Sequence, residues 1–497
     1  MTRLPFPLDA GLIGLIEHHA LSTPQRIALM DEASAITYSA LLSNIQRLAQ
    51  WLHAQGIRPG IKVGMAMHQS GKCYTSVFAL AAVGAICVPL PDNEHTIVQN
   101  HLDSFSVQYV LTDALLAPMQ GAKWLQFPDL HSLPAHTSGN FEICRSGPFW
   151  MAMSSGSLGD PKGVLLSQTQ LLQRVERSPF AYDAQSRGLP ISLGTSAGLT
   201  SALRANAWAG CVVLLPTDSA MQTLELAQRY AITHMMLMPL YAAQLVQQTA
   251  ALASLPNMQF LWLGGGACPA ALFEFLVHRI TPNVYIRYSA SEVGNIGFAS
   301  AALRRQFPDC AGRLNPWVQG QAVNEDDVPL PPGETGELRF QSPEFPASAE
   351  NDPATKQRFR GGWFYPGDIG RIDAQGLIFI EGRTGDRIIV AGVGIAASTV
   401  EAVVLNFPGM QEAAVFPAWI DGTRPVLGIA VVHHTAIDKA ALCDFLYQQI
   451  SGLNMLQLAV VSLQALPRSP MGKIRRAQLP LLMARIMQNL PANESQA

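Results

Sequence analysis

Residues 154–164 read SSGSLGDPKGV and combine three glycines, three serines and one lysine. Glycines let the backbone turn sharply and bring its N–H groups close to a ligand, while hydroxyls and an ammonium are donors suited to phosphate oxygens. Apolar residues 149–153 precede the stretch and residues 164–166 follow it. This pattern predicts a strand, a phosphate-binding loop, and then a strand or a helix. The spacing differs from a Walker A loop, and taken alone the stretch is equally compatible with a Gly/Ser-rich turn.

This stretch resembles the phosphate loop of the adenylate-forming superfamily. That group includes acyl- and aryl-CoA synthetases, the adenylation domains of peptide synthetases, and luciferase. The family loop reads roughly Ser/Thr-Ser/Gly-Gly-Ser/Thr-Thr-Gly-x-Pro-Lys-Gly. The present chain departs from it at Leu158, where a hydroxyl residue is usual.

Further motifs of the same superfamily follow in the family's order. Residues 288–292, YSASE, resemble Tyr-Gly-x-Thr/Ser-Glu, with Ser289 in place of glycine. Residues 363–368, WFYPGD, resemble Trp-Phe-x-Thr-Gly-Asp, with Pro366 in place of threonine. Residues 382–386, GRTGD, are similar to Gly-Arg-x-Asp/Lys-Asp and depart at Gly385. Residues 466–476, LPRSPMGKIRR, are similar to the C-terminal Pro-Arg-x-x-x-Gly-Lys-Ile-x-Arg. Their shared order over most of the chain argues against chance agreement.

Composition excludes several classes of protein. A chain of 497 residues is too long for one ordinary core and predicts two or three domains. The formal net charge is −3 and no block of like charges occurs, so nothing supports nucleic-acid binding. The seven cysteines are dispersed without a metal-ligand spacing, which is typical of reduced thiols in the cytoplasm. We recognise no signal peptide, and the apolar run 77–90 is too short to span a membrane.

The hydrophobic pattern predicts an α/β fold. Strand-like runs at 61–67, 85–90, 107–112 and 211–216 alternate with helical ones, which indicates crossover units and parallel sheets. We expect a large N-terminal domain, residues 1–383, with two mainly parallel sheets flanked by helices and a β subdomain. We also expect a small mobile α+β C-terminal domain, residues 386–497, that acts as a cap.

The resemblance implies ATP and Mg²⁺ as cofactors. Activation of a carboxylate by ATP requires neutralised phosphates, a held ribose and a cation between carboxylate and α-phosphate. Glu292 is the implied Mg²⁺ ligand, Ser291 the implied α-phosphate contact and Lys473 the implied cation. The residues with implied ATP-binding roles are Ser154, Ser155, Gly156, Ser157, Gly159 and Lys162 for the phosphates, Gly264, Gly265, Gly266, Ala267 and Tyr288 for the adenine, and Asp368 and Arg383 for the ribose and phosphates.

In the superfamily the small domain rotates after adenylation, and its other face then helps to form a tunnel for pantetheine. By resemblance, the hinge is Gly385 and the segment that moves in contains Gly392 and Gly394. Glycine allows a wide range of backbone angles, so it suits a hinge, although the family usually has Asp or Lys there.

The substrate follows less directly from the motifs. Amino-acid-activating relatives carry an Asp in the segment that here reads GTSAGL, residues 194–199, and this chain has none. We therefore expect an apolar pocket for an aryl or acyl acid. The expected lining residues are Thr195, Gly198, Leu199 and Met238.

The expected activity is activation of this acid to an acyl-adenylate, followed by transfer to the thiol of CoA or of a phosphopantetheinyl carrier protein. One alternative is a catalytically reduced homologue that binds nucleotide or acyl ligand. Another is an adenylating enzyme with a non-thiol acceptor. The retained charged motif residues favour the ligase.

Overall fold

The computed structural model describes most of the chain. The described residues are 3–90, 95–114, 119–134, 141–154, 162–215, 219–246, 254–266, 268, 270–342, 345, 356–384, 387–390, 393–420, 424–434, 436–450, 453, 456–468 and 474–488. The chain divides into two compact units. Unit 1 comprises residues 1–154, 160–319 and 340–364, and unit 2 comprises residues 155–159, 320–339 and 365–497. The expected division at residues 383–386 stays a prediction.

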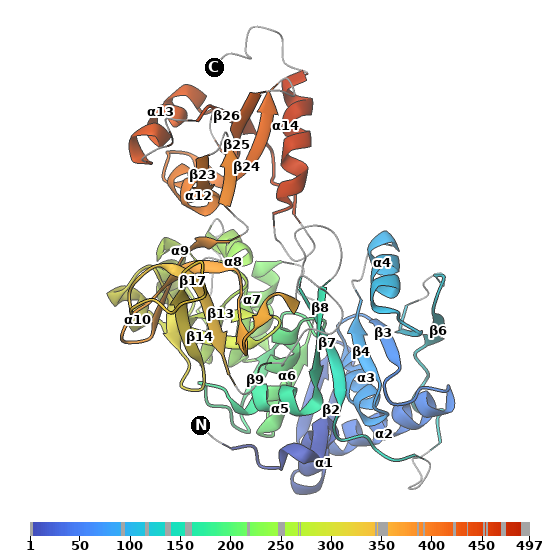
Figure 1. The fold of residues 1–497 in the computed structure, drawn as a ribbon. Coiled ribbons are helices and arrows are strands. Elements are labelled where there is room, and N and C mark those ends of the chain that lie inside the picture. The colour runs from blue at the N-terminus through green and yellow to red at the C-terminus, as the bar shows by residue number, and fades with distance from the viewer. Residues whose placement is uncertain are drawn as a thin grey trace. The chain divides into compact units, whose positions relative to one another are not determined.

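Unit 1 contains two mainly parallel sheets (Figure 1). The first sheet has the order β6 (Lys123–Gln126), β5 (Tyr109–Thr112), β3 (Lys62–Ala66), β4 (Ile86–Pro89), β7 (Pro148–Ser154) and β8 (Lys162–Ser167). All its pairs are parallel except β7 with β8, which are antiparallel. This sheet arises from the strand–helix alternation of the sequence, since parallel neighbours need crossover connections.

The second sheet of unit 1 has six consecutive parallel strands at its centre. Its order in this unit is β15 (Cys310–Leu314), β14 (Gly294–Ser300), β13 (Val284–Ala290), β12 (Phe260–Leu263), β11 (His234–Leu237), β9 (Arg187–Leu189), β10 (Cys211–Leu214), β1 (Ile27–Asp31) and β2 (Ala35–Thr37). Strands β13 through β1 in this order pair in parallel, and β14, β15 and β2 are antiparallel additions. Residues Phe359–Arg360 (β18) and Trp363–Phe364 (β19) form a short hairpin.

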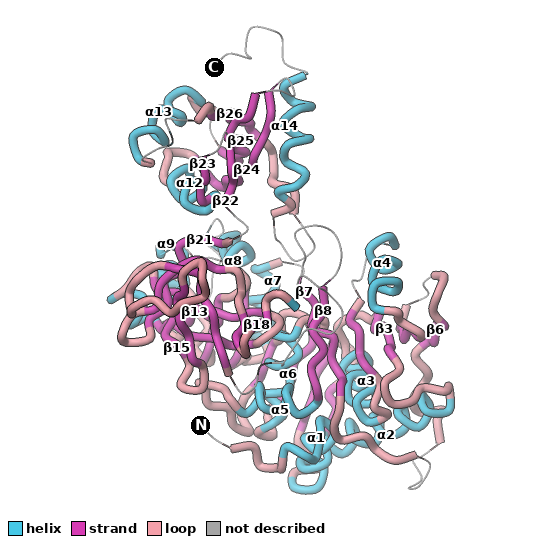
Figure 2. Tube along the Cα trace, viewed as in Figure 1, coloured by secondary structure: helices cyan, strands magenta, loops and turns pink. Residues whose placement is uncertain are grey.

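Helices flank these sheets (Figure 2). They are η1 (Leu8–Ala10), α1 (Gly11–Ser22), α2 (Tyr38–Ala54), α3 (Gly71–Ala82), α4 (His95–Phe105), α5 (Gln168–Glu176), α6 (Ser196–Ala207), α7 (Ala220–Arg229), α8 (Pro239–Val246), α9 (Ala270–Arg279) and α10 (Ala301–Gln306). Several begin at a side-chain cap: Ser70 caps α3, and Ser167 and Gln170 form a capping box on α5. In α2, residues Leu41, Ile45, Leu48 and Leu52 are fully buried, as their spacing along one helix face dictates.

Unit 2 contains further strands and helices. Its elements include most of β16 (Gln319–Val323) and β17 (Gly336–Gln341), then β20 (Asp368–Ile372), β21 (Leu377–Arg383), β22 (Arg387–Val390), β23 (Val393–Ala396), α12 (Ala397–Leu405), β24 (Met410–Ile420), β25 (Arg424–His433), α13 (Lys439–Gln449), β26 (Leu458–Ser462), η4 (Arg476–Gln478) and α14 (Leu479–Gln488). Strands β24, β25 and β26 form a sheet in that order, and α14 packs against β24 and β25 (Figure 1). The expected α/β class, with two largely parallel sheets and smaller α+β elements, is confirmed.

Candidate active site

The phosphate-loop stretch connects two paired strands. Strands β7 and β8 are antiparallel, and Ser154 lies opposite Lys162 where the pair ends. Gly163 is packed tightly, because a Cβ there would lie 2.5 Å from the Met151 sulfur and 2.8 Å from Phe105 Cε1. The connecting residues 155–161, which include the predicted Ser155, Gly156, Ser157 and Gly159, lie outside the described residues. Their roles, with those of Ser154 and Lys162, stay predictions.

The glycine-rich segment follows β12 at the carboxyl end of the parallel strands. Ligands of open α/β sheets bind at this edge. Gly265 has a φ of +87°, a conformation that favours glycine. Apart from its chain neighbours, no described residue has an atom within 4 Å of the position that a Cβ on Gly266 would take. The predicted Ala267 lies outside the described residues. The backbone of Gly265 and Gly266 is therefore accessible to a ligand at this edge.

The acidic motif residue Glu292 lies in the turn between β13 and β14. Its side chain is only 4% exposed, and its Oε1 lies 3.2 Å from Arg358 Nη1. Tyr288, on β13, packs edge-on against Phe340 with ring centroids 5.7 Å apart. Ser291, the residue before Glu292, is exposed. The structure thus holds a buried carboxylate at the end of the strand that carries the predicted adenine-stacking tyrosine.

The sequence reasoning missed Arg174, which holds this turn. Arg174 lies on α5 and is 3% exposed. Its Nη2 donates to the main-chain carbonyl of Glu292 at 2.6 Å, and its Nη1 donates to that of Ser291 at 3.4 Å. Gly294, with a φ of +80°, leaves room for the guanidinium, because a Cβ there would lie 3.2 Å from Arg174 Nε. An arginine in a helical pattern normally indicates a solvated position, so no sequence signal identified it.

Asp368 and Arg383 form a pair in unit 2. They lie opposite each other in the β20–β21 register, and Arg383 Nε donates to Asp368 Oδ1 at 2.8 Å. The Asp368 side chain is 5% exposed and that of Arg383 is 53% exposed. Gly367 has a φ of +78°, and its carbonyl accepts from Thr384 N at 2.8 Å. The two motifs, 15 residues apart, therefore meet through pairing of consecutive strands, while their roles toward ribose stay predictions.

Most of the site residues predicted in the mobile domain and its hinge lie outside the described part of the chain. These are Lys473, Gly385 and Gly392. Gly394 lies on β23, opposite Ile389 of β22. On either side of the lysine segment, Arg468 and Ile474 form an antiparallel bridge.

The predicted pocket residues have different surroundings. Met238 lies beside Gly265, because a Cβ on that glycine would be 3.8 Å from Met238 Cγ. Thr195 caps α6 by accepting from Gly198 N at 3.0 Å. A Cβ on Gly198 would lie 1.8 Å from the Ser192 carbonyl oxygen, and Leu199 is fully buried in the core beneath α1 to α3. Met238 therefore borders the glycine segment, whereas Gly198 and Leu199 pack inside the protein.

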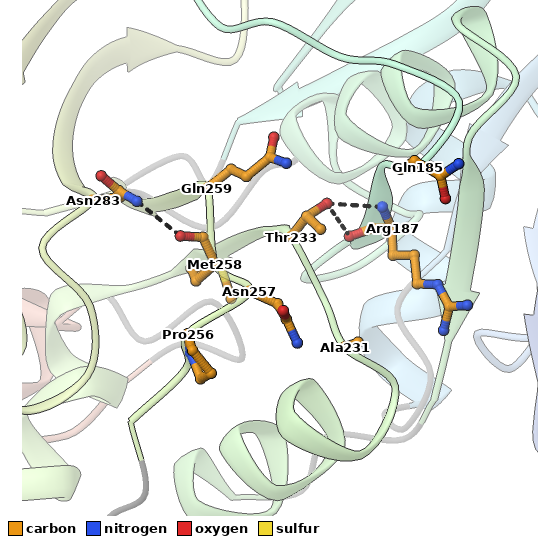
Figure 3. Close-up of a pocket in the computed structure, with 9 residues that line it drawn as sticks. All are labelled: Gln185, Arg187, Ala231, Thr233, Pro256, Asn257, Met258, Gln259 and Asn283. Atoms are coloured by element: carbon orange, nitrogen blue, oxygen red, sulfur yellow. Dashed lines mark hydrogen bonds between the residues drawn. The ribbon is translucent and has the colours of Figure 1, made fainter.

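A shallow hollow of about 530 Å³ occurs at the opposite, amino end of these strands (Figure 3). It is lined by Gln185, Arg187, Ala231, Thr233, Pro256, Asn257, Met258, Gln259 and Asn283. Some of its polar groups pair with one another: Thr233 Oγ1 accepts from Arg187 N at 2.8 Å, and Asn283 Nδ2 donates to the Met258 carbonyl at 2.9 Å. None of the predicted site residues lines it.

The donor chemistry of the described site fits a magnesium ion with few protein ligands. Mg²⁺ prefers oxygen and is usually held by one or two carboxylates together with substrate phosphates. Glu292 supplies one such carboxylate. Among the described residues, no group of three or more His, Cys, Asp or Glu side chains could hold a metal ion by itself. A zinc-like cage is therefore not found in that part of the chain.

Two curated proteins of similar sequence are CoA ligases. The chain is 26% identical over 507 residues to the indoleacetate–CoA ligase of Aromatoleum aromaticum, with 95% of this chain and 98% of that protein covered. It is also 26% identical over 498 residues to the 2-succinylbenzoate–CoA ligase of Geobacillus kaustophilus, again covering 95% and 98%.

A solved structure shares the fold. The o-succinylbenzoate CoA synthetase of Bacillus subtilis, in complex with ATP and magnesium ion, matches with a TM-score of 0.83 at 23% identity, covering 94% of this chain and 98% of that one. The sequence model of the AMP-binding enzyme family matches residues 16–345, which include the phosphate loop, the glycine segment and the Glu292 turn. The expected membership is confirmed: this chain belongs to the AMP-binding enzyme family.

Proposed function

We propose that this chain is an AMP-forming acid–thiol ligase. It uses ATP and Mg²⁺ to convert an aryl or acyl carboxylic acid to an acyl-adenylate and then transfers the acyl group to the thiol of CoA. Family membership and the ligase activity of the similar proteins named above support this function. The single structural observation that carries it is the buried Glu292 carboxylate, held at the carboxyl edge of the sheet.

The chemistry assigns a role to each part. A carboxylate oxygen attacks the α-phosphorus of ATP and pyrophosphate leaves, so the carbonyl becomes a good acceptor for a thiol. Mg²⁺, when bound, supplies positive charge that neutralises the phosphate oxygens. Glu292 would hold it, and the backbone of Gly265 and Gly266 would approach the base. Asp368 would accept from the ribose hydroxyls, and Lys473 would lie between carboxylate and α-phosphate.

The finer assignments remain part of the proposal. A phosphopantetheinyl carrier protein is an alternative acceptor to CoA, since both present the same thiol arm. We also propose a cytoplasmic location, in agreement with the dispersed cysteines. No helix within the described ranges is long and apolar enough to cross a membrane.

Pyrophosphate exchange tests the first half-reaction. We expect acid-dependent incorporation of labelled pyrophosphate into ATP across a panel of aryl and acyl acids, followed by thioester formation with CoA or a carrier protein. Pyrophosphate exchange followed by transfer of the acyl group to an amine, and not to a thiol, would favour the non-thiol alternative. Binding of ATP without exchange on any acid would favour the catalytically reduced homologue.

A further inference from the structure

Three buried arginines lie near one another in unit 1, and two of them contact an aromatic cluster. They are Arg174 on α5, Arg204 on α6 and Arg287 on β13, with exposures of 3%, 1% and 7%. The guanidinium carbons of Arg204 and Arg287 lie 5.6 Å and 5.7 Å from the ring centroid of Trp262. Trp262 lies on β12, packed with Phe180, Tyr182 and Met236. Charged side chains are almost never fully buried, so this concentration of positive charge requires an explanation.

Arg287 is held only weakly by the protein. Its Nη1 lies 3.7 Å from the Met236 sulfur, a weak acceptor, and its Nε has no acceptor among the described residues. No described acidic side chain forms an ion pair with it. Buried Arg304 shows how this chain satisfies a structural arginine, since it donates to the carbonyls of Cys310 at 3.1 Å and Cys268 at 3.0 Å. Arg287 differs because its donors point to no comparable acceptor.

The surroundings of Arg287 oppose its charge. Burial, followed by repulsion from Arg204 and Arg174, lowers the pKa of Arg287 to about 9. A second donor beside it is also unsatisfied, because the Nε1–H of Trp262 is buried and has no acceptor among the described residues. Leaving a charged group and a neighbouring donor buried without acceptors is costly, and a bound anion would remove that cost.

The position of Arg287 links this charge to the predicted nucleotide site. On β13, Arg287 and Tyr285 share the face that meets the aromatic cluster, whereas Val284 and Ile286 face the core on the other side. A Cβ on Gly264 would lie 3.6 Å from Arg287 Cβ and 3.1 Å from Met236 Cε. The arginine is therefore next to the glycine segment, at the carboxyl edge where a small ligand would bind.

We infer that Arg287 and Trp262 bind a second carboxylate of the acid substrate, with Arg204 adding positive charge around it. The substrate class is then an aryl or acyl acid that carries two carboxylates, one that reacts with ATP and one that stays ionised in this cationic cluster. The inference rests on the proposed function and differs from the expectation of an apolar pocket, which stays a prediction. A carboxylate suits arginine because the planar guanidinium can donate two parallel bonds to it.

Matched acids test this inference. Each pair differs by one carboxylate: hexanoate against adipate, 4-methylbenzoate against terephthalate, and 4-oxo-4-phenylbutanoate against 2-succinylbenzoate. In pyrophosphate exchange, we expect the dicarboxylate to have at least a tenfold higher kcat/KM than its monocarboxylate partner, in the pair that supports the fastest exchange. A higher kcat/KM for the monocarboxylate in every pair that supports exchange would overturn the inference.

Variants locate the effect. In Arg287→Met, the ratio of dicarboxylate to monocarboxylate kcat/KM should fall at least tenfold, and Arg287→Lys should restore part of it. The control is Arg304→Met, which removes a buried arginine with satisfied donors and should leave the ratio within twofold of wild type. An equal loss for both members of a pair in Arg287→Met would assign Arg287 to the reacting carboxylate or to the fold, and the inference would be wrong.

Thermal unfolding supplies a readout without turnover. In the presence of AMP, the preferred dicarboxylate should raise the Tm of the wild type, and Arg287→Met should lose this rise while its ligand-free Tm stays equal or increases. A fall in the ligand-free Tm with the dicarboxylate rise retained would contradict the inference. If no acid supports exchange, the proposed function fails, whereas this titration still decides whether a dicarboxylate binds at Arg287.

Discussion

Replacing Arg174 by methionine should weaken both the fold and the first half-reaction. Arg174 Nη2 donates at 2.6 Å to the carbonyl of Glu292, inside the protein, and Nη1 donates at 3.4 Å to that of Ser291. Its own carbonyl accepts from Arg204 Nη2 at 2.5 Å, a bond that the substitution keeps. The change therefore removes the two side-chain contacts to the turn that carries Glu292, while methionine retains much of the apolar volume.

The size of the effect follows from these bonds. A hydrogen bond from a charged donor typically contributes about 1.5–3 kcal/mol, and the longer contact to Ser291 adds less, about 0.5 kcal/mol. Removing one of three neighbouring buried cations relieves repulsion and offsets part of the loss. We expect a net decrease of about 1–3 kcal/mol in the free energy of unfolding. Because Glu292 is the predicted Mg²⁺ ligand, we also expect at least tenfold slower exchange at saturating acid.

Urea unfolding and pyrophosphate exchange at varied MgATP measure the two effects. Arg174→Lys should recover part of both, since lysine can donate to one carbonyl. Arg229→Met, at an exposed arginine on α7, serves as the control and should change stability by less than about 0.5 kcal/mol. Stability and exchange of Arg174→Met equal to those of the wild type would refute the assignment of Arg174 as the residue that positions the Glu292 turn.

Three further predictions concern other parts of the chain. Lys473→Ala should abolish most adenylate formation yet spare thioester formation from supplied acyl-adenylate, because it raises only the first barrier, by about 2–4 kcal/mol. An equal loss of rate in both half-reactions, measured separately, would contradict a rotating domain. Asp368→Ala should weaken ATP binding by about 1–3 kcal/mol in calorimetry without changing the preference among acids, and an altered acid profile with unchanged ATP affinity would count against a ribose contact. Burial lowers the pKa of His234 from 6.5 to about 4, so the folded state resists protonation and stability is lost as pH falls from 6.5 toward 4. This loss reaches up to about 3 kcal/mol, and His234→Gln should flatten that part of the stability–pH curve; an unchanged curve would show that His234 titrates normally.

Much of the fold was predictable from hydrophobic periodicity. The run at 61–67 became β3 (Lys62–Ala66), and the alternation around it produced a parallel sheet, because buried parallel strands read as continuous apolar runs. The motif at 154–164 was expected to follow a strand and does, between β7 and β8. The meeting of Asp368 with Arg383 was not predictable in detail, since it depends on the β20–β21 register.

The buried arginines were the main feature that the sequence concealed. Nothing in the residues around Arg174, Arg204 and Arg287 marks them as buried, and charged side chains are normally solvated. Their charges come together only in the folded protein, where α5 packs on α6 and both Arg204 and Arg287 lie over Trp262 of β12. The segment GTSAGL suggested an apolar pocket because it contains no charge, yet Arg204 follows five residues after Leu199 on the same helix. Local motifs therefore indicated the chemistry, whereas the proposed specificity depends on long-range packing.

Oxygen transfer tests the adenylation chemistry most directly. The protein is incubated with ATP, Mg²⁺, CoA and an acid labelled with ¹⁸O in its reacting carboxylate, and the products are analysed by mass spectrometry. Because the carboxylate oxygen attacks the α-phosphorus, the account predicts one ¹⁸O in the AMP, none in the pyrophosphate, and an acyl-CoA thioester. Label in inorganic phosphate together with ADP, or thioester formation with unlabelled AMP, would contradict it.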